Sequence, residues 1–202
     1  MDRLPQANFV RLCGKPMAAP LWSHRCRGRD FFLFPLEVCR LSGNRDRLNI
    51  LLSQDLTPAL AALSGRRIRL CGQLRSYNNH RGDGARLVIT VLAQEIAPAE
   101  EDDDNLVQLT GTLCKPPTLR LTPLGREICD LMLAVNRRYG RSDYLPCICW
   151  GTLAREAADW PVGTQVELTG RLQSRDYTKL TETGPVERTA FEVSASQLRR
   201  LE

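Results

Sequence analysis

The sequence lacks the features that mark membrane, secreted and most catalytic proteins. No apolar run approaches the ~18 residues that a membrane span needs, and Met1 to Val10 has no signal-peptide core. There is no P-loop, no Gly-x-Ser-x-Gly and no H-E-x-x-H motif. The only two histidines, His24 and His80, lie in loop-like contexts without a nucleophile or metal partner in view. These absences predict a cytoplasmic protein that is not an enzyme.

The eight cysteines lack the spacing of a zinc site, because no two of them form a C-x-x-C pair. Most are flanked by apolar residues, and Cys147 and Cys149 would share one face of a strand. We interpret them as reduced cysteines used as small core residues; disulfides or a bound metal are the alternatives. The sequence therefore predicts no metal and no cofactor.

Lysine is scarce, at three residues, and the positive charge is carried by arginine and unevenly distributed. Residues 1–99 carry a net charge of +8, residues 100–104 carry −5 and residues 105–202 carry +2. A positively charged first half suits a polyanionic partner. The alternative is a solvated surface in a protein that prefers arginine.

The chain reads as a duplicated domain. Residues 8–14 (NFVRLCG) match residues 105–111 (NLVQLTG) at an offset of 97, and residues 65–72 match residues 163–170 at an offset of 98. A repeat of about 100 residues is far longer than a solenoid unit. The acidic run 100–104 follows Ala97-Pro98-Ala99 and reads as a linker. We therefore expect a basic domain at 1–99, an acidic linker at 100–104 and a second domain at 105–202.

Each half is predicted to be mostly strands, because apolar and β-branched residues recur at a period near two between Gly and Pro residues. In the second half we expect strands at 106–113, 126–136, 144–150, 164–176 and 188–196. A short helix is expected at 152–160, and its counterpart in the first half at 58–63. Five strands with a helix between strands 3 and 4 is the OB-fold order. The predicted fold is all-β, with two tandem five-stranded OB-fold barrels.

The second half resembles the bacterial single-stranded DNA-binding proteins (SSB) over roughly residues 105–201. The segments that carry the resemblance are 109–117 (LTGTLCKPP), 133–137 (LAVNR), 150–154 (WGTLA), 163–172 (GTQVELTGRL) and 175–177 (RDY). The resemblance implies sequence-independent binding of single strands by stacking bases on aromatic rings, at roughly 1–3 kcal/mol per base. The positions implied for stacking are Tyr139, Tyr144, Trp150 and Tyr177; core aromatics are the alternative.

Basic residues interleave with these aromatics and favour a nucleic-acid groove, since cations near the backbone displace counterions. The candidate contacts in this half are Arg120, Arg137, Arg138, Arg141, Arg171, Arg175 and Lys179. Any one of them read alone is equally a solvated surface charge.

The first half departs from the family pattern. Its third strand has no aromatic at the positions of Tyr144 and Trp150, with Leu52 at the latter, and we expect Phe31, Phe32 and Phe34 in the core. Weaker DNA contacts are predicted at Arg40, Arg45, Arg47, Arg75, Tyr77 and Arg81. A protein-docking role is the alternative for this half.

The predicted function is binding and protection of single-stranded DNA in replication, recombination or repair. The chain ends soon after the fold, at 198–202, without the acidic tail typical of the family, which favours a specialised or mobile-element version. The alternative is a primosome-type OB-fold protein that acts mainly on replication or restart proteins. Analogy with the family predicts a homodimer that supplies four OB-folds.

Overall fold

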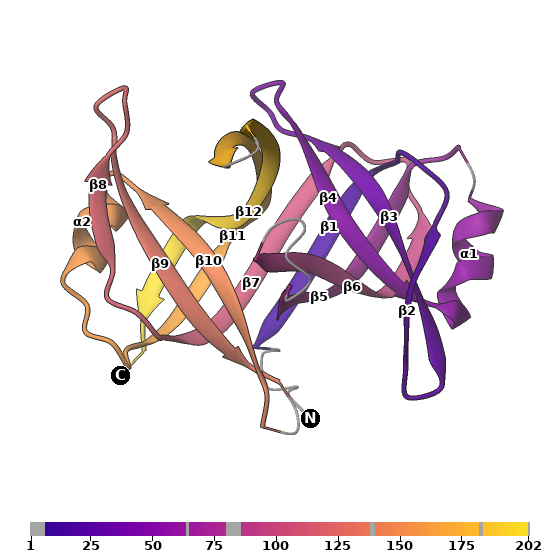
Figure 1. Ribbon diagram of the computed structural model, residues 1–202, viewed down its shortest axis with the longest axis horizontal. Helices are drawn as coiled ribbons and strands as arrows, with labels where there is room; N and C mark the ends of the chain where they lie inside the picture. The colour runs from indigo at the N-terminus through magenta and orange to yellow at the C-terminus, as the bar shows by residue number, and fades with distance from the viewer. Residues whose placement is uncertain (1–6, 64, 80–85, 138–139, 182–183, 202) are drawn as a thin grey trace. The chain divides into compact units, whose positions relative to one another are not determined.

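The computed structural model describes residues 7–63, 65–79, 86–137, 140–181 and 184–201, which form two compact units (Figure 1). Unit 2 consists of Val10–Arg75 and Ile89–Leu106; unit 1 consists of Met1–Phe9, Ser76–Val88 and Val107–Glu202. The predicted division at 99 and 105 stays a prediction. No helix among the described residues is long and apolar enough to cross a membrane.

Unit 2 is a closed barrel with the strand order β2-β3-β4-β6-β5-β1. The barrel closes because β1 also pairs with β3, where Lys15 lies opposite Glu37. A 3-10 turn, η1, and the helix α1 lie between β4 and β5. The elements are β1 (Asn8–Pro16), β2 (Leu21–Cys26), β3 (Arg29–Cys39), β4 (Arg45–Ser53), η1 (Gln54–Leu56), α1 (Thr57–Ala62), β5 (Ile68–Asn78) and β6 (Leu87–Pro98).

Unit 1 repeats this plan with the order β7-β11-β12-β10-β9-β8, and it closes where Thr112 of β7 lies opposite Ala134 of β9. The helix α2 lies between β10 and β11. The elements are β7 (Asp104–Leu113), β8 (Thr118–Leu121), β9 (Glu127–Asn136), β10 (Ser142–Trp150), α2 (Thr152–Ala158), β11 (Gln165–Thr181) and β12 (Gly184–Arg200).

The predicted fold class is confirmed, with one addition in each barrel. Five strands and the short helix lie in the expected order, but a further short strand, β2 or β8, pairs with the strand that follows it. Every residue of β2 and of β8 is exposed, so neither has the alternation that marks a strand in the sequence. His24, expected in a loop, lies in β2.

The repeated glycines mark the places where strands cross closely. A Cβ at Gly14 would clash with the carbonyl oxygen of Glu37, and a Cβ at Gly72 with that of Leu92. Gly170 meets Ser194 in the same way, and Gly111 would meet Ala134 at 2.9 Å. The sequence repeat therefore marks close approaches of two strands, at barrel closure for Gly14 and Gly111 and between neighbouring strands for Gly72 and Gly170, where any side chain would push the strands apart.

The acidic segment is bound to unit 2 rather than extended through solvent. Asp103 accepts a hydrogen bond from the Cys39 amide at 2.5 Å and pairs with Arg67. Glu101 pairs with Arg69 at 2.6 Å, and Asp104 already belongs to β7. The negative charges of the expected linker thus neutralise part of the positive charge counted for the first half.

Candidate nucleic-acid interface

Two of the predicted stacking residues, Tyr144 and Trp150, lie on the outward side of β10. The alternate residues Leu145, Cys147 and Cys149 are buried in the barrel, so Tyr144 and Trp150 lie on the opposite side of the strand, with the covered Ile148 between them. Tyr144 is 50% exposed and Trp150 is 39% exposed, although both are large rings that the core would readily accept. The core interpretation of these two aromatics is therefore excluded by the structure.

The cross-strand pairing shows which residues of β12 and β11 lie on the same side of the sheet as Tyr144 and Trp150. Ile148 of β10 lies opposite Ser194 of β12, and Ser194 lies opposite Arg171 of β11. Because side chains alternate along β11, Arg171, Arg175 and Tyr177 share its outward side. We call the set Tyr144, Trp150, Arg171, Arg175 and Tyr177 the outer aromatic face.

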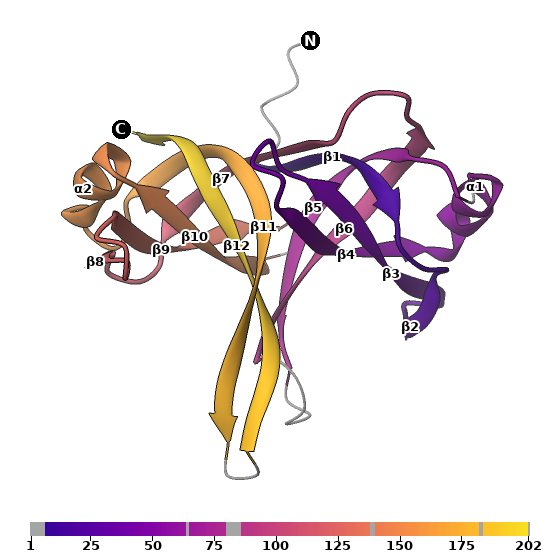
Figure 2. The ribbon, with the colours of Figure 1, turned by 90° about the horizontal axis from the view of Figure 1, so that it is seen from above.

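Tyr177 lies on a two-stranded arm, where the end of β11 and the start of β12 continue beyond the rest of unit 1 (Figure 2). Its ring is 37% exposed, and the Arg175 guanidinium carbon lies 5.9 Å from the ring centroid. This is a cation–π distance, so Arg175 restrains the orientation of the Tyr177 ring. Both side chains remain partly exposed to a ligand.

Arg188 is a residue of this site that the sequence did not identify. It lies directly opposite Tyr177 in the β11–β12 ladder, and therefore on the same face of the arm. Its Nε is shielded from solvent and has no hydrogen-bond partner within the described part of the chain. The cross-strand register, which places it beside Tyr177, is not readable from sequence spacing alone.

The backbone of Tyr144 is fixed by a small polar cluster. The Tyr144 amide donates to the Ser76 hydroxyl at 2.7 Å, and the Ser76 amide donates to Asp143 at 2.6 Å. Arg137 donates from Nε to Asp143 at 2.6 Å and from Nη2 to the Ser76 carbonyl oxygen at 2.9 Å. Asp143 is fully buried, so this charge requires its partner. Arg137 thus holds Asp143 and Ser76 in place, and through them the backbone of Tyr144.

A shallow pocket of about 630 Å³ adjoins Trp150. It is lined by Leu121, Gly125, Arg126, Glu127, Gly151 and Arg155, with Arg155 paired to Glu127. Gly151 has φ of 55°, a conformation that favours glycine, and its amide donates to the Glu127 carbonyl oxygen at 3.0 Å. This turn directs the chain into α2 beside the partly exposed Trp150.

The remaining candidates of the second half divide into three groups. Arg141 and Arg171 are exposed, whereas Arg120 is paired with Asp130. Arg138 and Tyr139 lie outside the described residues, as does the side chain of Lys179, whose backbone belongs to β11. Their predicted contacts stay predictions.

The candidates of the first half are mostly engaged in ion pairs or local bonds. Arg40 binds the buried Asp46 through two hydrogen bonds, Arg45 pairs with Glu37, and Arg75 bonds the Leu74 carbonyl oxygen. Arg47 and Tyr77 are exposed, and Arg81 lies outside the described residues. The weak contacts predicted for these residues stay predictions.

The three phenylalanines of β3 separate by position. Phe34 is buried as expected, but Phe31 and Phe32 are only half-buried. The buried Asp46 and Asp143 occupy equivalent positions of β4 and β10 and are 97 residues apart. At this offset the counterpart of Trp150 is Ser53, rather than the fully buried Leu52. No aromatic therefore occupies this position of β4, as the sequence indicated.

The cysteines are all free, and four of the eight are buried. Burial raises the pKa of Cys149 to about 12 and raises the pKa of Cys147 well above its ordinary value. Cys26 and Cys39 are exposed, so the core interpretation does not extend to them. Among the residues that the structure describes, no group of three or more His, Cys, Asp or Glu is placed to hold a metal ion.

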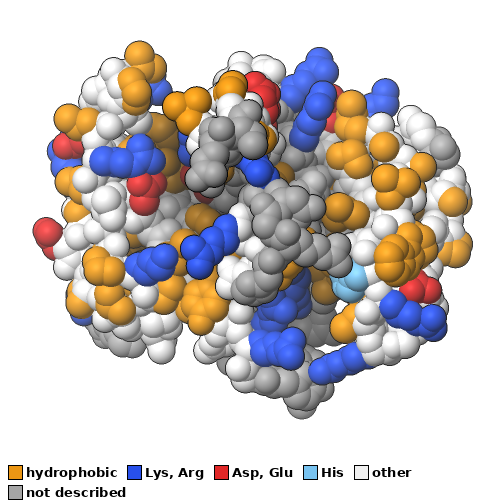
Figure 3. Space-filling view, in the orientation of Figure 1, with side chains coloured by type: hydrophobic (Ala, Val, Ile, Leu, Met, Phe, Trp, Pro, Cys, Tyr) orange, Lys and Arg blue, Asp and Glu red, His pale blue; other side chains and the backbone are white. Residues whose placement is uncertain are grey.

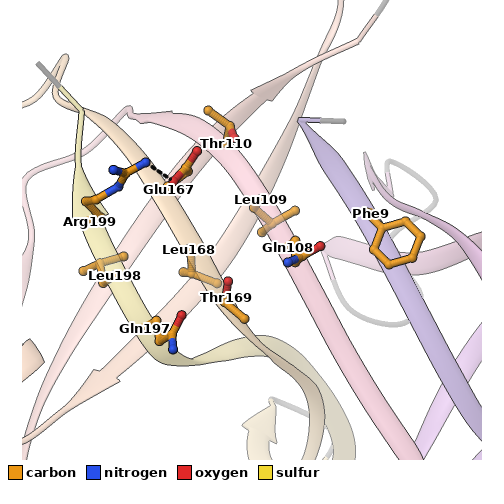
Figure 4. Close-up of a pocket in the computed structure, with 10 residues that line it drawn as sticks. All are labelled: Phe9, Gln108, Leu109, Thr110, Glu167, Leu168, Thr169, Gln197, Leu198 and Arg199. Carbon is orange, nitrogen blue, oxygen red and sulfur yellow. Dashed lines mark hydrogen bonds and ion pairs between the residues drawn. The ribbon is translucent and has the colours of Figure 1, made fainter. Parts of the chain in front are cut away.

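A second pocket, of about 490 Å³, lies on the outer face of β7, β11 and β12 (Figure 4). Glutamine and threonine side chains from the three strands line it, and Arg199 pairs with Glu167 there. Phe9 is its sole aromatic lining residue. Its lining mixes polar and leucine side chains and is charge-neutral, whereas on the face over β9 and β10 hydrophobic and Arg or Lys side chains intermix (Figure 3).

The two closed barrels, each with a short helix before its fourth main strand, define the class of tandem OB-fold proteins. Residues 104–201 match the model of the single-strand binding protein family. The second barrel, residues 104–201, therefore belongs to the single-strand binding protein family.

Individual relatives agree with this assignment. Single-stranded DNA-binding protein 2 of Listeria innocua and single-stranded DNA-binding protein A of Bacillus subtilis are each 36% identical to it over 80 residues. These matches cover 36% of this chain and 50% and 46% of those proteins. The chain thus spans about half the length of the curated relatives it matches.

A solved structure is similar over nearly the whole chain. The wild-type single-stranded DNA binding protein from Thermus aquaticus superimposes with a TM-score of 0.78 at 25% identity, covering 96% of this chain and 93% of that one. The similarity therefore includes both barrels, and not only the half that matches the family model.

Proposed function

We propose that this protein binds and protects single-stranded DNA without sequence preference, in replication, recombination or repair. The observation that carries the proposal is the outer aromatic face, where exposed rings and arginines share one side of a continuous sheet. Every base has a flat π-face, so exposed rings stack on any sequence, and flanking cations track the phosphate backbone. The role is one of binding rather than catalysis, in the cytoplasm.

Binding by stacking and binding by charge alone make different predictions. We would titrate fluorescently labelled dT oligomers and matched duplexes at two salt concentrations, and follow anisotropy together with the protein's tryptophan fluorescence. Stacking on Trp150 predicts quenching of fluorescence and a strong preference for the single strand. Equal affinity for duplex and single strand would contradict the proposal, because charge alone would explain it.

We further propose that the chain acts as a homodimer with four cooperating OB-folds. The support is analogy with the family together with the presence of two barrels in each chain. Sedimentation velocity at micromolar concentration is expected to give twice the chain mass of 22.7 kDa. A monomer at that concentration, with or without DNA, would overturn this part of the proposal.

A further inference from the structure

The β2–β3 hairpin of unit 2 carries a pair of stacked rings that the sequence did not identify as a site. The rings of His24 and Phe31 lie 5.1 Å apart between centroids and are inclined by 7°. His24 is exposed, like every other residue of β2, whereas Phe31 is half-buried beside β4. A half-buried ring thus supports an exposed flat ring at the surface of the barrel.

This stack lies on unit 2 at the rung that corresponds to the rung of Trp150 on unit 1, but on the neighbouring strands β2 and β3. In unit 1, Trp150 of β10 lies directly opposite Ile128 of β9. In unit 2, the corresponding positions, 97 residues earlier, are Ser53 of β4 and Phe31 of β3, which also lie opposite each other. In unit 1 the aromatic residue of this pair is on β10, whereas in unit 2 it is on β3, the strand that corresponds to β9. Both barrels therefore present an aromatic ring at the same rung of the outer face.

The surroundings of the stack are cationic. Arg25, Arg27 and Arg29 lie at the hairpin end, and the two-residue turn has positive φ at both Arg27 (49°) and Gly28 (78°). A left-handed Arg costs roughly 1 kcal/mol relative to glycine, so this cation is placed there against backbone preference. Figure 3 shows hydrophobic, Arg and His side chains side by side over β2 and the start of β3.

The hairpin is also held in shape by its own contacts. Trp22 donates from Nε1 to Asp30 at 3.2 Å, and the Asp30 amide donates to the Gln54 side chain at 3.1 Å. Arg29 lies 3.6 Å from Asp55, but both side chains are more than half exposed, so this pair is weak and the guanidinium remains accessible. The rings are therefore presented on an ordered support.

We propose that the His24–Phe31 stack and the flanking arginines form a second base-stacking site for single-stranded DNA, on unit 2. This proposal rests on the proposed function. It gives the first barrel a role in DNA binding by base stacking as well as by charge. A base stacks on the exposed face of His24, backed by Phe31, while Arg27 and Arg29 at the hairpin end contact the adjacent phosphates. The same chemistry on unit 1 uses Trp150 and the arginines around it.

The test is photocrosslinking of the full chain to a dT oligomer of about 35 nucleotides that contains 5-bromouracil, followed by tryptic digestion and mass spectrometry. Binding at the outer aromatic face places adducts on peptide 142–155, which contains Tyr144 and Trp150. Binding at the proposed site also places adducts on peptide 12–25 or 30–40, which contain His24 and Phe31. Adducts on 142–155 alone would overturn the second site and leave the proposed function standing. Absence of both adducts and affinity would overturn the proposed function itself.

Variants distinguish stacking from proximity. His24→Ala is expected to weaken binding of the long oligomer by about five- to a hundredfold, the loss of one stacked base. His24→Tyr keeps a flat ring and is expected to keep the affinity. Leu41→Ala, at a fully exposed position of the same unit, is the matched control and should change nothing. Equal affinities for His24→Ala and Leu41→Ala would overturn the proposal, and since His24 is exposed, its substitution leaves the fold intact.

Discussion

Arg137 donates from Nε to Oδ2 of Asp143 at 2.6 Å, and the carboxylate it meets is fully buried one residue before the exposed ring of Tyr144. The same pair recurs 97 positions earlier, where Arg40 binds the buried Asp46. Each barrel therefore contains a buried charge that is neutralised by an arginine across the turn. In unit 1 this pair also fixes Ser76, whose hydroxyl holds the Tyr144 amide.

We expect Arg137→Gln to destabilise the protein strongly, because it leaves the Asp143 carboxylate buried without its charged partner. The free energy of unfolding should fall by about 3 kcal/mol, measured by urea denaturation. Arg155→Gln is the control, since the pair of Arg155 with Glu127 is largely exposed and its loss should cost under about 1 kcal/mol. If Arg137 instead contacts a phosphate, the salt dependence of DNA binding would weaken while stability stayed unchanged.

Trp150→Ala and Tyr177→Ala should each weaken binding of dT oligomers by roughly 1–3 kcal/mol, because each removes one stacking surface. The double variant should lose roughly 2–6 kcal/mol if the two stacks add. Anisotropy titrations at fixed salt measure the loss. Val162→Ala, which trims an exposed apolar residue away from the face, serves as control. A double variant within 0.5 kcal/mol of the wild type would remove both rings from the site.

Arg188→Ala should reduce affinity and also reduce the slope of log affinity against log salt by about 0.7, the value for one phosphate contact on a single strand. The reason is that Arg188 lies beside Tyr177, where a phosphate would follow a stacked base. Arg199→Ala removes an arginine that pairs with Glu167 at the polar pocket, and it should leave the slope unchanged. Identical slopes for the two variants would place Arg188 outside the interface.

The exposed and the buried thiols should differ in their reaction with a thiol reagent. Cys26 is exposed and should react with a thiol reagent at pH 8; Cys39 should react more slowly, because its interaction with Asp103 raises its pKa. Cys149, whose pKa burial raises to about 12, should stay unmodified until the protein unfolds. Mass spectrometry of the labelled peptides measures the order. Rapid native labelling of Cys149 would contradict its burial.

The same pKa shift predicts how stability changes in alkali. The folded-state pKa of Cys149 lies above its ordinary value of 9.0, so its contribution to stability is complete below pH 9 and is lost as the pH rises toward about 12. Urea denaturation between pH 8 and 11 should therefore show a falling free energy of unfolding. Cys149→Ala should flatten this fall, whereas Cys26→Ala, at an exposed site, should not.

The sequence predicted the barrels because strands half-buried in a closed sheet must alternate, and because the repeated glycines fall where strands cross. It predicted the start of α2 at Thr152 correctly, but the helix ends at Ala158 rather than at 160. It missed β2 and β8, whose residues are all exposed and carry no periodic signal. Alternation is thus informative only for strands with one buried face.

The candidate site was predictable in part for a related reason. Tyr144 and Trp150 share strand parity, so their common face followed from spacing alone. Arg188 and His24 become part of a surface only through partners on a neighbouring strand, and cross-strand register depends on turns and bulges such as that between Trp22 and His24. Likewise, the sequence could not show that Arg137 and Arg40 are bound to buried carboxylates.

The crossing glycines have a consequence for how such a surface can change. Since the strands that close each barrel approach closely at Gly14 in one unit and at Gly111 in the other, closure does not depend on which outward residue stands on which strand. A ligand-binding ring can then stand on the adjacent strand and remain at the same rung of the sheet. Two copies of one barrel can in this way carry their aromatic rings on different strands and still present a stacking surface to a nucleotide at the same rung.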